Sequence, residues 1–367
     1  MAGSTFGTLF KITTWGESHG KALGVIVDGC PAGISLSESD IQPYLDRRKP
    51  GQSAFSTKRN ESDCVEILSG VFEGKTTGTP ISLIVYNQDQ KSKDYGDIAT
   101  SYRPGHADYC FDEKYGFRDY RGGGRSSGRE TIGRVAAGAI ASKVLKELGI
   151  SLTAYTRSIG DCVIDYSRFD IDEINNNPHY MPDKECAQQA SDFLSNIMKE
   201  LDSIGSSVEC IISGMPVGVG EPVFDKLDAR LAQAIMSIGA VKAVEIGDGT
   251  AVATSKGSFN NDNFKIQDNC VTKLSNHSGG ILGGMSDGSD ILVRASFKPT
   301  PSIFKEQQTI NSSHENIKIA IKGRHDPIIG PRAVVVVEAM CACTILDLLM
   351  QNMSSKIDNL QKIYGKL

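Results

Sequence analysis

The stretch that decides the fold is VIVDGCPAG at residues 25–33, because the chain contains a close counterpart to it, CIISGMPVG, at residues 210–218. Each copy joins an apolar run typical of a β-strand to a turn that contains Gly and Pro. Gly29 and Gly214 occupy equivalent positions in the two copies, and the offset of 185 between them is about half of the 367 residues. The sequence therefore predicts two related halves.

An amphipathic segment follows each copy and carries a similar tetrad, LDRR at 45–48 and LDAR at 227–230. A repeated strand, turn and helix favours a mixed α/β fold in which both halves contribute to one core. No linker rich in Pro, Gly and Ser separates the halves. We therefore expect a single domain over residues 1–367, with an internal repeat of about 1–185 and 186–367.

Composition excludes several classes of protein. A net charge of −5 and a pI near 5.8 argue against a surface built as a whole for nucleic acid or for an anionic membrane, so an anion site must be local. The nine cysteines form no C-x-x-C pair, which favours a reducing compartment. The first residues lack the pattern of a signal peptide, and no window reaches the ~18 apolar residues of a membrane span. These features predict a cytoplasmic protein without a membrane partner.

Periodicity predicts one clear helix, over residues 128–148, with a capping box formed by Ser127 and Glu130 at its start. The polar segment 86–109 is typical of a long surface loop that covers a site. Residues 175–183 are expected to form another exposed loop. The chain from residue 351 onward is expected to be a polar tail.

Arginines cluster around the glycines at 122–124, just before that helix. Glycine lets a ligand approach the backbone, a helix N-terminus offers free N–H groups, and arginine binds phosphate or carboxylate through paired hydrogen bonds. The cluster contains Arg103, Arg118, Arg121, Arg125, Arg129 and Arg134. It indicates a site for a small, multiply charged anion. The alternative is pairing on a solvated face with Asp108, Asp112, Glu113 and Asp119.

Three of the six histidines lie in turns rich in glycine and charge: His19, His106 and His325. Because histidine titrates near neutral pH, it can deliver a proton to a leaving phosphate. The alternative for any single histidine is a structural role. We assign no role to His179 or His314.

Other ligand classes are disfavoured. The chain has no H-x-x-x-H or C-x-x-C spacing, so we expect no metal held by the protein. The glycines of 214–223 lack the dinucleotide-binding spacing, and a phosphate-binding G-x-x-x-x-G-K-[ST] motif is absent. By contrast, four glycines within 276–286 could accept a flat ring, although such a loop is often only a turn. Lys298 and the hydroxyls of 298–302 suit a phosphate.

Four motifs together resemble the chorismate synthase family: GESHG at 16–20, RPGHAD at 103–108, GGGRSSGRET at 122–131 and GRHDP at 323–327. The resemblance spans the chain. It implies a 1,4-anti elimination of phosphate from 5-enolpyruvylshikimate 3-phosphate, the last step of the shikimate pathway, which requires reduced FMN without net redox change. It also implies a single-domain sandwich with helices between antiparallel sheets, a homotetramer, an association with NADP, and reduced flavin supplied by a separate reductase.

The resemblance assigns roles to individual residues. His19 would protonate the leaving phosphate, and His106 would manage charge near N1 and the C2 carbonyl of the flavin. Asp326 would assist proton handling at flavin N5. Ser18 and Ser127 would position these groups.

The same resemblance assigns the binding residues. The substrate's anionic groups would be bound by Arg48, Arg103, Arg129 and Arg324. The flavin would be contacted by Arg125, Ser126, Ser127, Gly239, Ala240, Gly283, Lys298, Pro299, Thr300, Pro301, Ser302 and Arg324.

The chain departs from the family pattern at Ala54, where relatives commonly carry a substrate-binding arginine, and at Gly239, where they often carry a larger residue. Gly128 replaces a more frequent alanine. A lyase with a different substrate is therefore one alternative. Another is an RNA-binding module, since RGGGR at 121–125 is similar to an arginine–glycine box.

Overall fold

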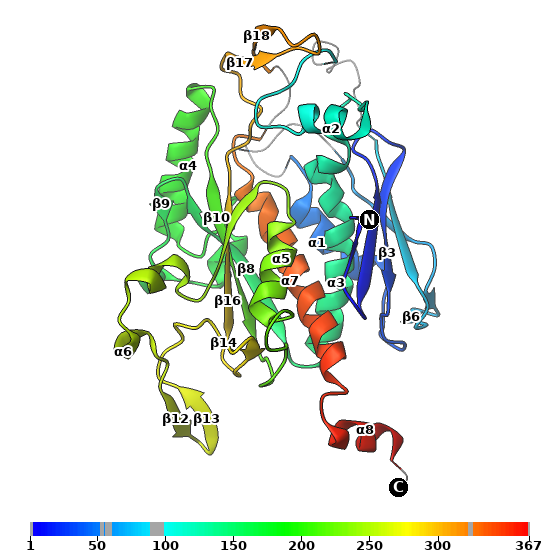
Figure 1. The fold of residues 1–367 in the computed structure, drawn as a ribbon, viewed down its shortest axis with the longest axis vertical. Coiled ribbons are helices and arrows are strands. Elements are labelled where there is room, and N and C mark those ends of the chain that lie inside the picture. Colours follow the sequence, from blue (N-terminus) through cyan, green and yellow to red (C-terminus); the bar gives the residue numbers. More distant parts are fainter. Residues whose placement is uncertain (1–2, 52–54, 56–60, 89–98, 322–325, 366–367) are drawn as a thin grey trace.

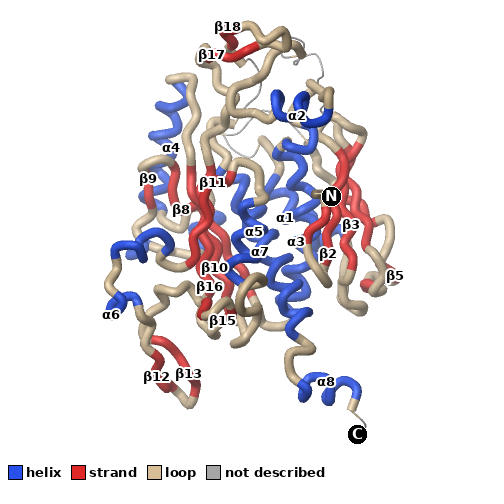
Figure 2. Tube along the Cα trace, viewed as in Figure 1, coloured by secondary structure: helices blue, strands red, loops and turns tan. Residues whose placement is uncertain are grey.

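The computed structural model describes residues 3–51, 55, 61–88, 99–321 and 326–365. Two five-stranded antiparallel sheets enclose a layer of helices (Figures 1 and 2). The expected α/β sandwich with helices between antiparallel sheets is confirmed.

The first sheet is formed by the N-terminal part of the chain. Its strands, in spatial order, are β1 (Thr5–Phe6), β2 (Lys11–Gly16), β3 (Ala22–Asp28), β7 (Ile81–Tyr86) and β4 (Val65–Ile67). Side chains alternate between the two faces of a strand, and in β7 the buried residues are Ile81, Leu83 and Val85. This alternation gives the sheet one apolar face, which packs on the helices.

The second sheet is formed by the later part of the chain. Its strands, in spatial order, are β11 (Val241–Ile246), β16 (Ile291–Phe297), β10 (Ser206–Ser213), β8 (Ser151–Ile159) and β9 (Cys162–Val163). In the inner strand β16 every second residue is buried, from Ile291 to Phe297. Arg294 lies on the opposite face and pairs with Glu209 and Glu245 on the neighbouring strands.

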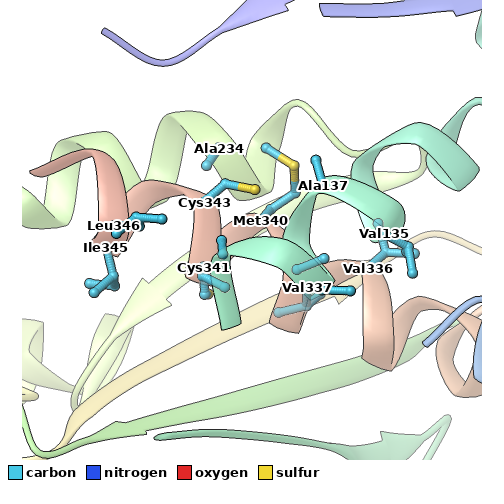
Figure 3. Close-up of a cluster of buried hydrophobic side chains, with 14 of the residues drawn as sticks. Val135, Ala137, Ala234, Val336, Val337, Met340, Cys341, Cys343, Ile345 and Leu346 are labelled. Atoms are coloured by element: carbon cyan, nitrogen blue, oxygen red, sulfur yellow. The ribbon is translucent and has the colours of Figure 1, made fainter. Parts of the chain in front are cut away.

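Four helices fill the space between the sheets: α1 (Glu38–Arg48), α3 (Thr131–Glu147), α5 (Leu227–Met236) and α7 (Gly330–Asn352). The expectation that no segment is apolar enough to span a membrane was wrong for α7. An 18-residue window of α7 passes that test, but 89% of the window is buried inside the protein. α7 is apolar on all sides because it is the central helix of the core and contacts α3, α5 and both β8 and β10. Figure 3 shows apolar side chains of α3, α5 and α7 packed together.

A single glycine sets how closely α3 approaches α7. A Cβ atom added at Gly138 would lie 2.2 Å from the Cβ and 2.4 Å from the Cα of Ala339. Small residues on both helices therefore let the two backbones meet, and no larger pair fits at this point.

The two stretches that suggested the repeat form the same hydrogen bonds. The hydroxyl of Thr76 donates to the carbonyl of Pro31 at 2.6 Å, and the hydroxyl of Ser286 donates to the carbonyl of Pro216 at 2.5 Å. The amide three residues after each proline donates back to the same hydroxyl, at 3.0 and 2.9 Å. We infer from these contacts that the halves are related and form one domain.

A second, smaller apolar cluster lies on the far side of the second sheet, beneath α4 (Lys184–Lys199). The expectation that 175–183 forms an exposed loop was wrong, because His179, Met181 and Asp183 are buried. The His179 ring lies 5.1 Å from the ring of Phe55. Because most residues of this segment are polar, the sequence did not indicate that part of it packs under α4.

Short elements complete the described chain. They are β5 (Val71–Phe72), β6 (Lys75–Thr76), β12 (Phe264–Gln267), β13 (Cys270–Lys273), β14 (Ile281–Leu282), β15 (Met285–Ser286), β17 (Gln307–Ile310), β18 (Asn316–Ile319), α2 (Asp108–Tyr115), α6 (Gly257–Asn260) and α8 (Ile357–Tyr364). The end of the chain is thus not a simple polar tail, because α8 is an amphipathic helix.

Candidate active site

The segments that carry most of the predicted site residues lie at one end of the helix layer, near α2 (Figure 1). The turn between β2 and β3, the end of α1, the start of α3 and the segment after β16 converge there. Hydrogen bonds and ion pairs between these segments define the geometry of the site.

At its centre, two buried arginines share one carboxylate. Arg48 and Arg129 lie 2.8 and 3.0 Å from the two oxygens of Asp63, and Arg129 also lies 3.6 Å from Glu61. The side chains of Arg48 and Arg129 are only 2% and 4% exposed. Arg48 donates through Nε to the hydroxyl of Thr131 at 3.1 Å. The structure therefore brings together two of the predicted substrate-binding arginines in a site of high local charge.

Glu61 and Asp63 were not predicted from the sequence. Both side chains are fully buried, and acidic residues are almost never buried unless they are paired. Two acidic residues in a polar stretch gave no signal of burial in the sequence. Only the position of the arginines shows which charges they balance.

His19 lies in the turn between β2 and β3 and is nearly buried. Its Nδ1 is 3.1 Å from the hydroxyl of Ser18, which fits the predicted positioning role of that serine. Gly122 packs against the ring: a Cβ at this position would lie 2.6 Å from His19, and its φ of +89° also favours glycine. Arg103 donates to the carbonyl of Gly122 at 3.2 Å, so the glycine segment, the histidine and the arginine are packed together.

Arg103 forms a buried, two-pronged pair with Asp108, with both hydrogen bonds at 2.7 Å. Burial alone would raise the pKa of Asp108, but the hydrogen bonds and charge of Arg103 outweigh burial and hold that pKa below its ordinary value. The carboxylate is therefore ionised, and it orients the turn that carries His106.

His106 meets the segment that was predicted to hold flavin. Its Nε2 lies 2.7 Å from the hydroxyl of Ser302, and the ammonium of Lys298 donates to the carbonyl of Gly105 at 2.6 Å. The backbone amide of Lys298 also donates to the carbonyl of Ala240 at 2.9 Å. The structure thus joins three of the predicted flavin-contacting segments.

Two features of these segments fit a bound polar ring system or phosphate. Within the part of the chain that the structure describes, the hydroxyl of Thr300 is buried without a hydrogen-bond partner. A Cβ at Gly239 would have no described heavy atom within 4 Å. An unsatisfied buried hydroxyl and open space beside bare backbone are what a ligand with acceptor groups requires.

The remaining arginines are partly explained by the alternative of pairing with acidic residues. Arg118 pairs with Asp112 at 3.0 Å, and Arg121 pairs with Asp119 at 2.7 Å. Arg125 instead donates to the backbone carbonyls of β2, at 3.0 Å each. The cluster therefore contains structural pairs as well as the buried arginines of the site.

The helix predicted over 128–148 is confirmed as a 3₁₀ turn, Gly128–Glu130, followed by α3. The capping box was half wrong. Ser127 accepts from the amide of Arg129 at 3.3 Å, but the Glu130 carboxylate binds Arg134 at 2.8 Å because a cation is a stronger partner than an amide.

Asp326 is connected to this site through α7. The guanidinium of Arg332 binds the Asp326 carboxylate, and its Nε donates to the backbone carbonyl of Arg48 at 3.1 Å. Ala54 and Arg324 lie outside the described residues.

Gly283 is not brought to the site in this chain. It lies in the turn between β14 and β15, before the start of β16, whereas Lys298 follows the end of β16. A strand of seven residues spans about 20 Å, so the two residues lie near opposite ends of the sheet. Among the neighbouring glycines, Gly279 and Gly284 are packed against backbone or side chains.

Within the described residues, no group of three His, Cys, Asp or Glu side chains is placed to hold a metal ion. The site as described combines arginines, histidines and carboxylates, which suits binding and proton transfer at a polyanion.

Comparison with known proteins agrees with this chemistry. Residues 10–350 match the family model described as chorismate synthase. The chain is 64% identical to the chorismate synthase of Agathobacter rectalis and covers 100% of both sequences, and it is 54% identical to that of Paracoccus denitrificans over 95% of this chain and 96% of the relative. A crystal structure of chorismate synthase matches with a TM-score of 0.77 and 30% identity, covering 97% of this chain and 96% of that one.

Proposed function

The chain belongs to the chorismate synthase family of lyases, and from that membership we propose that it eliminates phosphate from 5-enolpyruvylshikimate 3-phosphate to form chorismate. The observation that supports this most directly is the pair of buried arginines, Arg48 and Arg129, which Asn87 connects to the turn that carries His19. The substrate carries two carboxylates and a phosphate, and an acidic protein must concentrate cations locally to bind it.

The elimination removes one ring proton and one phosphate. The electron pair of the breaking C–H bond ends in the new double-bond system, and the phosphate leaves with the electron pair of its C–O bond. The reaction is redox-neutral overall. Reduced FMN, when bound, would supply electron density to the substrate and accept the ring proton.

The residues of the chain bind the substrate and hold protons. Arg48 and Arg129, fixed by Asp63, would bind anionic groups of the substrate, with Arg103 and Arg324 as the further predicted contacts. His19, oriented by Ser18, would protonate the leaving phosphate.

The segments that would hold FMN are those around His106. Lys298 and the hydroxyls of Thr300 and Ser302 would bind polar groups of the cofactor, and bare backbone at Gly239 would accept its ring. His106 would stabilise charge on the ring. Arg125, Ser126, Ser127, Ala240, Pro299 and Pro301 complete the proposed set in this chain.

Asp326, held in place by Arg332, would assist proton handling at N5 of the flavin. Gly283 lies beyond β14, too far from Lys298 for both residues of one chain to contact the same flavin, so Gly283 is left out of the proposed flavin site of this chain. The homotetramer, the separate flavin reductase, the association with NADP and the cytoplasmic location remain proposals that rest on the family resemblance.

The test is the formation of chorismate and phosphate from 5-enolpyruvylshikimate 3-phosphate under anaerobic conditions with chemically reduced FMN. We expect turnover that depends on reduced FMN and falls about 10²–10⁴-fold in His106→Ala, the range for loss of an acid–base group. His314→Asn is the control, because His314 is exposed and asparagine tolerates its φ of +61°. Absence of turnover in the unaltered protein would overturn the proposal and direct attention to Ala54.

A further inference from the structure

We propose that Asn87 is a positioning residue for the elimination, because its side-chain amide fixes the turn that carries His19 relative to the substrate-binding Arg129. This inference rests on the proposed function. It assigns Asn87 no contact with substrate or flavin.

Asn87 connects three segments that are distant in the sequence. Its Nδ2 donates to the carbonyls of Glu17 and Gly20 at 3.0 and 2.8 Å. Its Oδ1 accepts from Nε of Arg129 at 2.8 Å. Glu17 and Gly20 flank Ser18 and His19, so the amide holds both ends of the turn that carries the histidine.

The orientation of this amide is unambiguous. Nε of Arg129 can only donate, and the two backbone carbonyls can only accept. The oxygen of Asn87 must therefore face Arg129, and its nitrogen must face the turn. Reversing the amide would place a donor against a donor and an acceptor against two acceptors.

Asn87 is itself held firmly. It follows β7 directly, where Tyr86 pairs with Ala22 of β3, and its backbone amide donates to the carbonyl of Lys21 at 3.1 Å. The side chain therefore extends from the end of an inner strand rather than from a free loop. Because the backbone of Asn87 is fixed in this way, its side-chain amide can hold Arg129 and the turn at 17–20 at a set distance from each other.

The two groups that Asn87 joins would act on the same substrate. Arg129 is buried and paired with Asp63, and His19 is oriented by Ser18, so each is fixed locally. Neither of these local contacts sets the position of the histidine relative to the arginine. Asn87 supplies that link, and a displacement of about 1 Å between a binding group and a reacting group can lower turnover about 100-fold.

The experiment measures kcat and KM for Asn87→Ala, for His19→Ala and for the double variant, with reduced FMN. We expect Asn87→Ala alone to lower kcat about 10–100-fold. If Asn87 acts through His19, the same substitution should change kcat less than about threefold once His19 is absent, since residues that act as a unit are not additive. A merely structural role would lower kcat by a similar factor in both backgrounds.

Two further variants make the result decisive. Asn87→Asp keeps the oxygen that accepts from Arg129 but loses both hydrogen bonds to the turn. It should therefore lower kcat when His19 is present and change kcat little when His19 is absent, even if the alanine variant folds poorly. Asn177→Ala is the matched control, because Asn177 also bridges two carbonyls, those of Glu173 and Met181, at 2.9 and 2.8 Å, and neither belongs to the proposed site. It should leave kcat within about twofold.

The outcomes are separable. Inactive unaltered protein would overturn the proposed function, and the inference would fall with it. Active protein with an Asn87→Ala variant of normal kcat, or with equal losses in both backgrounds, would overturn the inference while leaving the proposed function intact.

Discussion

The close approach of α3 to α7 gives a prediction about stability that can be worked from the structure. A Cβ added by Gly138→Ala would lie 2.2 Å from the Cβ and 2.4 Å from the Cα of Ala339, whereas unstrained carbon atoms are about 3.5–4.0 Å apart. Because the second atom belongs to the backbone, no side-chain rotation relieves the clash. The two helices must move apart by more than about 1 Å.

Overpacking of this kind costs about 1–3 kcal/mol, and a clash with backbone belongs at the upper end. Replacing glycine by alanine inside a helix returns about 1 kcal/mol through helix propensity. We therefore expect Gly138→Ala to lower the free energy of unfolding by about 2 kcal/mol. At about 2.1 cal/mol/K per residue, the unfolding entropy of a chain of this length is about 0.8 kcal/mol/K, so Tm should fall by about 2–3 °C.

The assay is thermal and urea unfolding followed by circular dichroism, with Gly128→Ala as the control. Gly128 lies at the start of the same helical segment, and no described heavy atom lies within 4 Å of a Cβ there, so its alanine variant should be as stable as the parent or up to about 1 kcal/mol more stable. Ala339→Gly should restore only part of the stability of Gly138→Ala, because the clash with the backbone of residue 339 remains. A Gly138→Ala variant at least as stable as the parent would refute the packing argument.

Three further predictions concern single contacts. Asp347→Ala should lower the free energy of unfolding, measured in urea, by about 3–5 kcal/mol, because the carboxylate accepts hydrogen bonds from three successive backbone amides, those of residues 8–10. Asp347→Asn should lower it by less. Burial lowers the pKa of His179 to about 4, below the value of about 6.5 in the unfolded chain, so the neutral ring stabilises the fold above pH 6.5 and this contribution is lost as pH falls towards 4. Between pH 7 and 4.5 the free energy of unfolding of the parent should therefore fall by about 2 kcal/mol more than that of His179→Asn. Equal decreases in the two proteins would contradict this prediction. Ser302→Ala should weaken the binding of reduced FMN about fivefold by removing the partner of His106, measured by anaerobic fluorescence titration, and unchanged affinity would place the flavin elsewhere.

The sequence predicted the elements whose pattern is local. The strand and turn at 25–33 recur as predicted at 210–218, and the helix that starts near Gly128 follows from its periodicity alone. The apolar character of α7 was underestimated, because a helix that contacts neighbours on every side resembles a membrane span in composition.

The parts of the site that the sequence could not predict are those that depend on long-range pairing. His19 and Arg129 lie in quoted motifs and Arg48 was assigned from the family resemblance, but their partners Asp63 and Asn87 lie in stretches with no motif of their own. Charge balance and amide bridging are decided by distances between residues 15–70 positions apart, which no local pattern encodes. For the same reason the separation of Gly283 from Lys298 became visible only in the fold.

The position of α7 in the chain has a consequence for biosynthesis. α7 follows every strand of both sheets, yet it is the helix against which α3, α5, β8 and β10 pack. A nascent chain on the ribosome therefore carries a second sheet whose inner face at β8 and β10 lacks α7 until residues 330–352 have been synthesised, whereas the first sheet already has α1 and α3 to pack against. Until α7 packs there, this exposed apolar face is a target for chaperones and a risk for aggregation.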